Sequence, residues 1–105
     1  MTKNIFQKII DKEIPSEFLY EDELCIAIND IHPKAPLHIL LIPKKAITGI
    51  DEIDENDKDL IAHLIYTAKA LANRNKCLGY RLQFNVGEKG GQEVPHLHLH
   101  LLGWF

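Results

Sequence analysis

The feature that most constrains this 105-residue chain is an alternation of histidine and leucine near its end, His96-Leu97-His98-Leu99-His100-Leu101-Leu102. Side chains at every second residue of a β-strand leave from the same face of the sheet. A strand over residues 96–102 therefore puts the three imidazoles on one face and the leucines on the other. Leucines suit a hydrophobic core, whereas three polar rings in a row are costly to bury without partners. The histidine face is the first candidate for a functional site.

Length and composition predict an ordinary globular protein. A chain of 105 residues has the usual size of one domain, here 1–105, with one core. The net charge of −3 predicts no polybasic surface, so we expect no binding to nucleic acid or to a membrane. No apolar run approaches the roughly 20 residues that span a bilayer, and the first residues lack a signal-peptide pattern. We expect a cytoplasmic protein whose two cysteines are reduced packing groups.

The rest of the pattern predicts an α+β fold. Asn4 can cap a short helix that ends near Ile14, because the residue before Pro15 is pushed out of the helical region. Apolar residues at a period near 3.6 predict one long helix over 57–75, with Gly79 just past its end. We expect strands at 18–20, 24–28, 38–43, 80–86 and 96–102, the third of them central. Together these form a five-stranded, mostly antiparallel sheet with one long and one short helix.

Three uses of the histidine row are open from the residues alone. One is a metal site, but His96 and His100 would stand about 13 Å apart along the strand, so all three rings could not share one ion, and His38 is the only obvious further ligand. Another is a purely structural role. The third is nucleophilic catalysis at phosphorus, because a neutral imidazole attacks well near its unperturbed pKa of about 6.5. The neighbouring rings would then orient the attacker and contact the phosphate or the leaving group.

Residues 96–102 match the His-φ-His-φ-His-φ-φ signature of the histidine triad (HIT) family, in which φ is apolar. The chain resembles this family over essentially its whole length. Within it, several runs resemble the Hint branch, the histidine triad nucleotide-binding proteins, with Glu93 as in bacterial members. These runs are Asn4-Ile5-Phe6, Lys12-Glu13-Ile14-Pro15, Asp30-Ile31 with Pro33 and Ala35-Pro36, Ile42-Pro43-Lys44-Lys45, and Gly90-Gly91-Gln92-Glu93-Val94.

The resemblance implies a purine nucleoside phosphoramidate hydrolase, with aminoacyl-adenylates as a further substrate class. It implies AMP or GMP conjugates as partners, no metal or other cofactor, and a homodimer whose sheets join into one of ten strands. His98 would be the nucleophile that attacks the α-phosphorus. His100 would contact the phosphate and leaving group, His96 would support the nucleophile, and His38 would buttress the triad.

The same resemblance assigns nucleotide-binding residues. Asp30 would bind the ribose hydroxyls, and Asn85 with the backbone near Val94 would face the phosphate. Gln92 and Glu93 belong to the same binding set. The base pocket would be lined by four apolar residues that the pattern alone would assign to the core: Phe6, Ile9, Ile28 and Ile31.

Some positions depart from the animal members of the family. Glu93 stands in place of a serine near the leaving group, which predicts a preference for amine over anionic leaving groups. Ala46 replaces a histidine, His32 is an extra imidazole that we expect to be exposed, and only Gly103, Trp104 and Phe105 follow Leu102. Substrate preference therefore stays open. Two alternatives are a nucleotide-binding or scaffolding module with incidental turnover, and a dinucleoside polyphosphate hydrolase.

Overall fold

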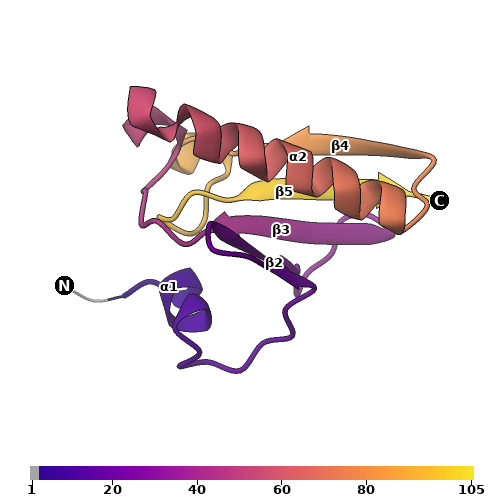
Figure 1. Cartoon of the computed structure of the whole chain (residues 1–105), viewed down its shortest axis with the longest axis horizontal. Helices are drawn as coiled ribbons and strands as arrows, with labels where there is room; N and C mark the ends of the chain where they lie inside the picture. Colours follow the sequence, from indigo (N-terminus) through magenta and orange to yellow (C-terminus); the bar gives the residue numbers. More distant parts are fainter. Residues whose placement is uncertain (1–2) are drawn as a thin grey trace.

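The structure, a computed structural model, describes residues 3–105 (Figure 1). It consists of α1 (Ile5–Ile10), β1 (Tyr20–Glu21), β2 (Cys25–Asn29), β3 (Leu37–Pro43), α2 (Lys58–Arg74), β4 (Gly79–Gln83) and β5 (Leu99–Trp104), with three 3-10 helices, η1 (Ile50–Glu52), η2 (Glu55–Asp57) and η3 (Glu88–Gly90). The predicted α+β fold with one long and one short helix is confirmed. Within residues 3–105, no helix is long and apolar enough to cross a membrane.

The five strands form one sheet in the order β1-β2-β3-β5-β4, and every neighbouring pair is antiparallel. β3 is central, as its uniformly apolar sequence predicts. The two α-helices lie on opposite faces of this sheet (Figure 1). Under α2 the core contains Leu64, Ala68 and Leu71 packed on the leucines of β5, and under α1 it contains Phe6 and Ile9 packed on β2 and β3.

Both α-helices end in a left-handed lysine, which the sequence did not predict. Lys12 has φ 61° and Lys76 has φ 60°. After each lysine the next backbone N–H returns to a carbonyl five residues earlier, from Glu13 to Lys8 at 2.8 Å and from Cys77 to Ala72 at 3.0 Å. This is the Schellman geometry, which normally uses glycine. The prediction that α1 runs to near Ile14 is therefore wrong. The predicted end of α2 at residue 75 is correct to within one residue, but Lys76, not Gly79, takes the left-handed position after it.

The histidine segment enters the sheet later than predicted. β5 begins at Leu99, not at His96, although the neighbouring strand β3 continues to Pro43. In the register of these strands Pro43 would lie opposite Leu97, but proline has no N–H to donate. The Pro43 carbonyl accepts from the His96 ring at 2.9 Å, and the Leu97 N–H donates to the Ile47 carbonyl at 2.7 Å. The segment stays extended, so the alternation of faces survives: Leu97, Leu99 and Leu101 are fully buried.

Two other strands also differ in extent from the prediction. β1 covers Tyr20–Glu21 and not 18–20, and β4 stops at Gln83, short of residue 86. Each of these strands lies at an edge of the sheet. An edge strand has a partner on one side alone, so its length follows the partner more than its own side-chain pattern.

Candidate active site

The sheet brings four histidines together on the face that α1 covers. The ring centroids of His98 and His100 are 4.9 Å apart, and those of His38 and His100 are 5.2 Å apart. The ring of Phe6, from α1, meets His98 edge-on at 5.0 Å. His38 joins the row because β3 pairs with β5, placing residue 38 opposite Leu102.

His96 is held at both ring nitrogens. His96 is buried, with 1% exposure, and its Nε2 lies 2.9 Å from the Pro43 carbonyl. Because a carbonyl can only accept, Nε2 carries the proton. Nδ1 then accepts from the Asn4 side-chain nitrogen at 3.2 Å. A ring with both nitrogens engaged is a positioning group, not a nucleophile.

His98 has one ring nitrogen engaged and one available. Its Nδ1 lies 2.7 Å from the backbone carbonyl of His96, so Nδ1 carries the proton and donates. In the neutral ring, Nε2 then holds the lone pair that a nucleophile needs. His98 also lines the main cavity of the site.

His100 is oriented through His38. The Lys34 backbone N–H donates to His38 Nδ1 at 3.1 Å, which puts the proton of His38 on Nε2. That nitrogen lies 2.9 Å from His100 Nδ1 and 3.5 Å from the Asp30 carboxylate. His100 Nδ1 therefore accepts, and its proton sits on Nε2. The Asn85 side-chain nitrogen 3.4 Å from this Nε2 is also a donor, so it does not accept the Nε2 proton. His100 can donate a hydrogen bond into the cavity.

Burial keeps three of these rings neutral near pH 7. Desolvation lowers the pKa of His38 and of His96. It also lowers the pKa of His100 to about 4, and the neighbouring rings of His98 and His38 act in the same direction. A charged imidazole in this row would lack water and face other imidazoles, so the uncharged form is favoured.

We expect this cluster to make the protein acid-sensitive. In the unfolded chain a histidine takes up a proton near pH 6.5, whereas folded His100 does so near pH 4. Between these pH values the unfolded state binds more protons than the folded state. The stabilising contribution of His100 is therefore complete above about pH 6.5 and is lost as the pH falls. Urea denaturation should therefore give a lower free energy of unfolding at pH 5 than at pH 7.5. In a His100→Asn variant this difference between the two pH values should be smaller. An equal loss in that variant would contradict the assignment.

The histidines open onto a cavity of about 470 Å³. Of the predicted site residues, His38, His96 and Gln92 do not line this cavity and all the others do. The predicted residues that line it are Phe6, Ile9, Ile28, Asp30, Ile31, Asn85, Glu93, Val94, His98 and His100. The apolar residues come from α1, from β2 with the residues that follow it, and, in the case of Val94, from the segment before β5. Ile31 is 84% exposed, which is unusual for isoleucine and leaves an apolar side chain at the mouth of the cavity.

Gln92 lies outside this cavity, and its side-chain amide is already engaged. Its Nε2 donates to the carbonyls of Thr48 at 2.7 Å and Val94 at 3.1 Å, and its Oε1 accepts from the Gly87 N–H at 3.1 Å. Gln92 thus ties the glycine-rich loop to the segment after β3. Six further lining residues were not predicted from the sequence: Ile5, Asn29, His32, Lys34, Leu40 and Gly91. Several of them are next to predicted residues in the sequence, and this proximity could have indicated them.

A free imidazole nitrogen beside a part-apolar, part-polar cavity, presented from the middle of an alternating His-Leu segment, is the arrangement expected of a histidine triad protein. A family model described as "Scavenger mRNA decapping enzyme C-term binding" matches residues 3–104. An uncharacterized HIT-like protein of Synechococcus elongatus is 49% identical over 100 residues, which cover 94% of this chain and 88% of that protein. The chain therefore belongs to the HIT family, whose members bind nucleotide substrates.

Two solved structures extend this likeness to the fold. A HIT family hydrolase from Legionella pneumophila has a TM-score of 0.93 and 47% identity, covering 96% of this chain and 92% of that one. A HIT family hydrolase from Clostridium thermocellum has a TM-score of 0.94 and 43% identity, covering 100% of this chain and 93% of that one. The fold is that of HIT family hydrolases.

Proposed function

We propose that this protein is a purine nucleoside phosphoramidate hydrolase of the Hint branch, which passes its nucleotide through His98. The observation that carries the proposal is the bond from His98 Nδ1 to the His96 carbonyl. That bond fixes the tautomer and leaves Nε2 as a lone-pair donor at the cavity. We place the reaction in the cytoplasm, where the free thiols of Cys25 and Cys77 would stay reduced.

The proposed reaction has two displacements at phosphorus. In the first, a bond forms between His98 Nε2 and the α-phosphorus, and the bond from phosphorus to the amine nitrogen breaks. The amine takes a proton that His100 Nε2 relays from solvent. In the second, water attacks phosphorus, the bond to His98 breaks, and the proton of the water returns to solvent through His100. Splitting one displacement into two lets a well-placed nitrogen replace water as the first attacker.

The lining of the cavity supports nucleotide as the substrate. Phe6, Ile9, Ile28 and Ile31 provide an apolar surface for a purine ring. Asp30, whose carboxylate accepts from the His32 N–H at 2.8 Å, has a second oxygen for ribose hydroxyls. Asn85, beside His100, would then contact the phosphate. Aminoacyl-adenylates share all of these groups and would also fit.

Charge at the cavity mouth favours an amine leaving group over a polyphosphate. Glu93 lines both the main cavity and an adjoining depression, and Glu88 lines that depression as well. Two carboxylates would repel the anionic leaving group of a dinucleoside polyphosphate. Comparing turnover of adenosine and guanosine 5′-phosphoramidates with that of a dinucleoside polyphosphate tests the proposal. Faster cleavage of the polyphosphate would reject it, and nucleotide binding without turnover would favour the scaffolding alternative.

Glu93→Ser should change the preference among leaving groups. Removing the carboxylate relieves repulsion of an anionic leaving group and leaves an uncharged amine little affected. The ratio of kcat/KM for an amine-leaving substrate to that for an acidic-leaving substrate is therefore expected to fall several-fold. Steady-state assays on a matched substrate pair measure this ratio. An unchanged ratio would show that Glu93 does not act on the leaving group.

We also propose that the protein is a homodimer joined through β4. This strand lies at the end of the sheet, and all five of its residues are exposed. Its free edge can pair with β4 of a second copy to give a sheet of ten strands. Exposed apolar side chains occur on this strand at Tyr80 and Leu82, and immediately before it at Leu78.

Leu82→Glu should convert the dimer to a monomer, because two carboxylates would be buried at the junction of the sheets. Leu24→Glu is the matched control: Leu24 is similarly exposed, 46% against 39% for Leu82, but lies at the opposite end of the sheet. Analytical ultracentrifugation gives the mass of each. A monomeric wild-type protein, or a dimer unaffected by Leu82→Glu, would reject this interface.

A further inference from the structure

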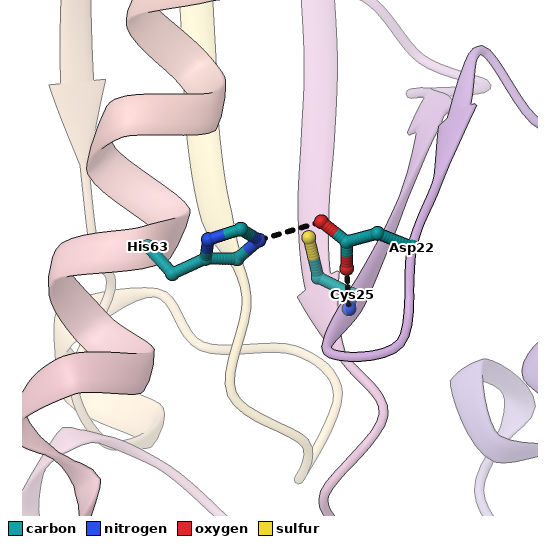
Figure 2. A group of neighbouring side chains, drawn as sticks. All are labelled: Asp22, Cys25 and His63. Atoms are coloured by element: carbon teal, nitrogen blue, oxygen red, sulfur yellow. Dashed lines mark hydrogen bonds and ion pairs between the residues drawn. The ribbon is translucent and has the colours of Figure 1, made fainter.

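A second cluster of reactive side chains lies on the other face of the sheet. Figure 2 shows Asp22 in the turn between β1 and β2, Cys25 at the start of β2, and His63 pointing toward them from α2. The potential ligand atoms of these three residues all lie within 4.8 Å of one another. Cys25 belongs to the core under α2, whereas the four histidines of the active site lie on the α1 face. The proposed reaction makes no use of this cluster.

Asp22 is held so that one carboxylate oxygen faces His63. Its Oδ1 accepts from the backbone N–H groups of Leu24 at 2.7 Å and Cys25 at 2.8 Å. Its Oδ2 lies 2.6 Å from His63 Nε2 and accepts from the Tyr20 hydroxyl at 2.6 Å. Although partial burial opposes it, these hydrogen bonds keep the pKa of Asp22 below its usual range. The carboxylate is thus ionised and oriented before any ion arrives.

The chemistry and spacing of the three residues match those of zinc ligands. Zinc binds thiolate sulfur, imidazole nitrogen and carboxylate oxygen, and two ligands separated by two residues are its usual pair from a hairpin. Asp22 and Cys25 have this separation on a tight hairpin, and His63 supplies a third ligand from a helix. Tetrahedral ligands at zinc bond lengths stand about 3.5 Å apart, so side-chain adjustments of about an ångström would close the site.

We propose that Asp22, Cys25 and His63 form a binding site for a zinc ion, with water as the fourth ligand. The Asp22 and His63 side chains are 24% and 31% exposed, so an ion can reach these two ligands from solvent, whereas Cys25 is fully buried. Tyr20 and the backbone N–H groups would orient the ligating carboxylate, as outer-shell partners do. The ion would link the β1–β2 turn to α2, which makes it a structural metal and not a cofactor of the reaction.

Binding requires one proton to leave the cluster and one to move. Burial raises the pKa of the Cys25 thiol to about 12, so without metal the thiol is protonated, and its proton passes to solvent as the sulfur–zinc bond forms. As a ligand, His63 carries its ring proton on Nδ1 instead of Nε2, and the bond from Nε2 to zinc replaces the hydrogen bond to Asp22. One thiolate and one carboxylate then balance the charge of the ion.

Cobalt(II) provides a probe that separates this site from the active site. Asp30, His38 and His100 also lie within 4.8 Å of one another, but that group holds no sulfur. Adding Co²⁺ to the chelator-treated full chain should produce a thiolate-to-cobalt charge-transfer band, which one equivalent of Zn²⁺ abolishes. Cys77→Ser, the matched control at the other cysteine, should keep the band, and Cys25→Ser should lose it. A wild-type spectrum without a thiolate band, or a band that survives Cys25→Ser, would overturn the proposal.

A surface variant keeps the test valid if Cys25→Ser disturbs the core. His63→Gln should retain the far-ultraviolet circular dichroism of the wild type while its affinity for Zn²⁺ falls at least about tenfold. Zn²⁺ should raise the Tm of the wild type and of Cys77→Ser, because it binds the folded state, but not that of His63→Gln. An equal rise in His63→Gln would place the ion elsewhere. Neither result depends on phosphoramidate turnover, so failure here leaves the proposed function untouched.

Discussion

Replacing His98 with alanine should lower kcat/KM for a purine nucleoside phosphoramidate by about 10⁴-fold or more, with binding of AMP retained. The reason lies in the bonding of the row: His96 has both nitrogens engaged and His100 is held by His38, so His98 Nε2 alone is placed to attack. Steady-state kinetics and calorimetric titration with AMP measure the two effects. His63→Gln, on the opposite face, is the control that should keep wild-type turnover.

Two results would contradict this prediction. Turnover within about tenfold of wild type in His98→Ala would mean that water, not His98, attacks phosphorus. Loss of AMP binding together with turnover would mean that the variant has lost the shape of the cavity, and His98→Asn would then serve as the smaller change.

Leu101→Ala should produce a large loss of stability. Leu101 is fully buried in the core under α2, and truncating a buried leucine to alanine costs about 2–5 kcal/mol. The Tm should therefore fall by about 8 °C or more, because a domain of this size loses about 4–8 °C per kcal/mol. Thermal and urea denaturation measure the change.

The contrast between the two faces of the segment over residues 96–102 makes this a test of their assignment. Leu24→Ala, at an exposed leucine, should change the free energy of unfolding by no more than about 0.5 kcal/mol. His98→Ala should cost far less stability than Leu101→Ala while costing far more activity. If Leu101→Ala were as stable as wild type, the assignment of the leucine face to the core would be wrong.

The period of the sequence predicted which side chains share a face and, to within one residue, the extent of α2, but it did not predict where α1 and several strands end. The alternation over 96–102 placed the histidines together even though β5 begins at Leu99. The position of that boundary depends on which groups the Pro43 and Ile47 carbonyls accept from, and residues far along the chain decide this. The end of α1 was missed, and so was the residue after α2 that takes the left-handed conformation, because Lys12 and Lys76 take a conformation that usually signals glycine.

The same limit applied to the functional residues. The cavity lining followed from the family motif, since motif residues are near one another in sequence or on paired strands. The role of Gln92 as a loop tie depends on Thr48, 44 residues away. The cluster of Asp22, Cys25 and His63 depends on α2 packing across the sheet. No local pattern could have indicated either contact.

The most direct test of the central claim is to trap the covalent intermediate. Wild-type protein is mixed with adenosine 5′-phosphoramidate, quenched rapidly in base, where phosphorus–imidazole bonds persist, and analysed by intact-mass and peptide mass spectrometry. We expect one added adenylyl group, located on His98 and missing from His98→Ala. Turnover without any adduct in the wild type, or an adduct on a different residue, would contradict the account.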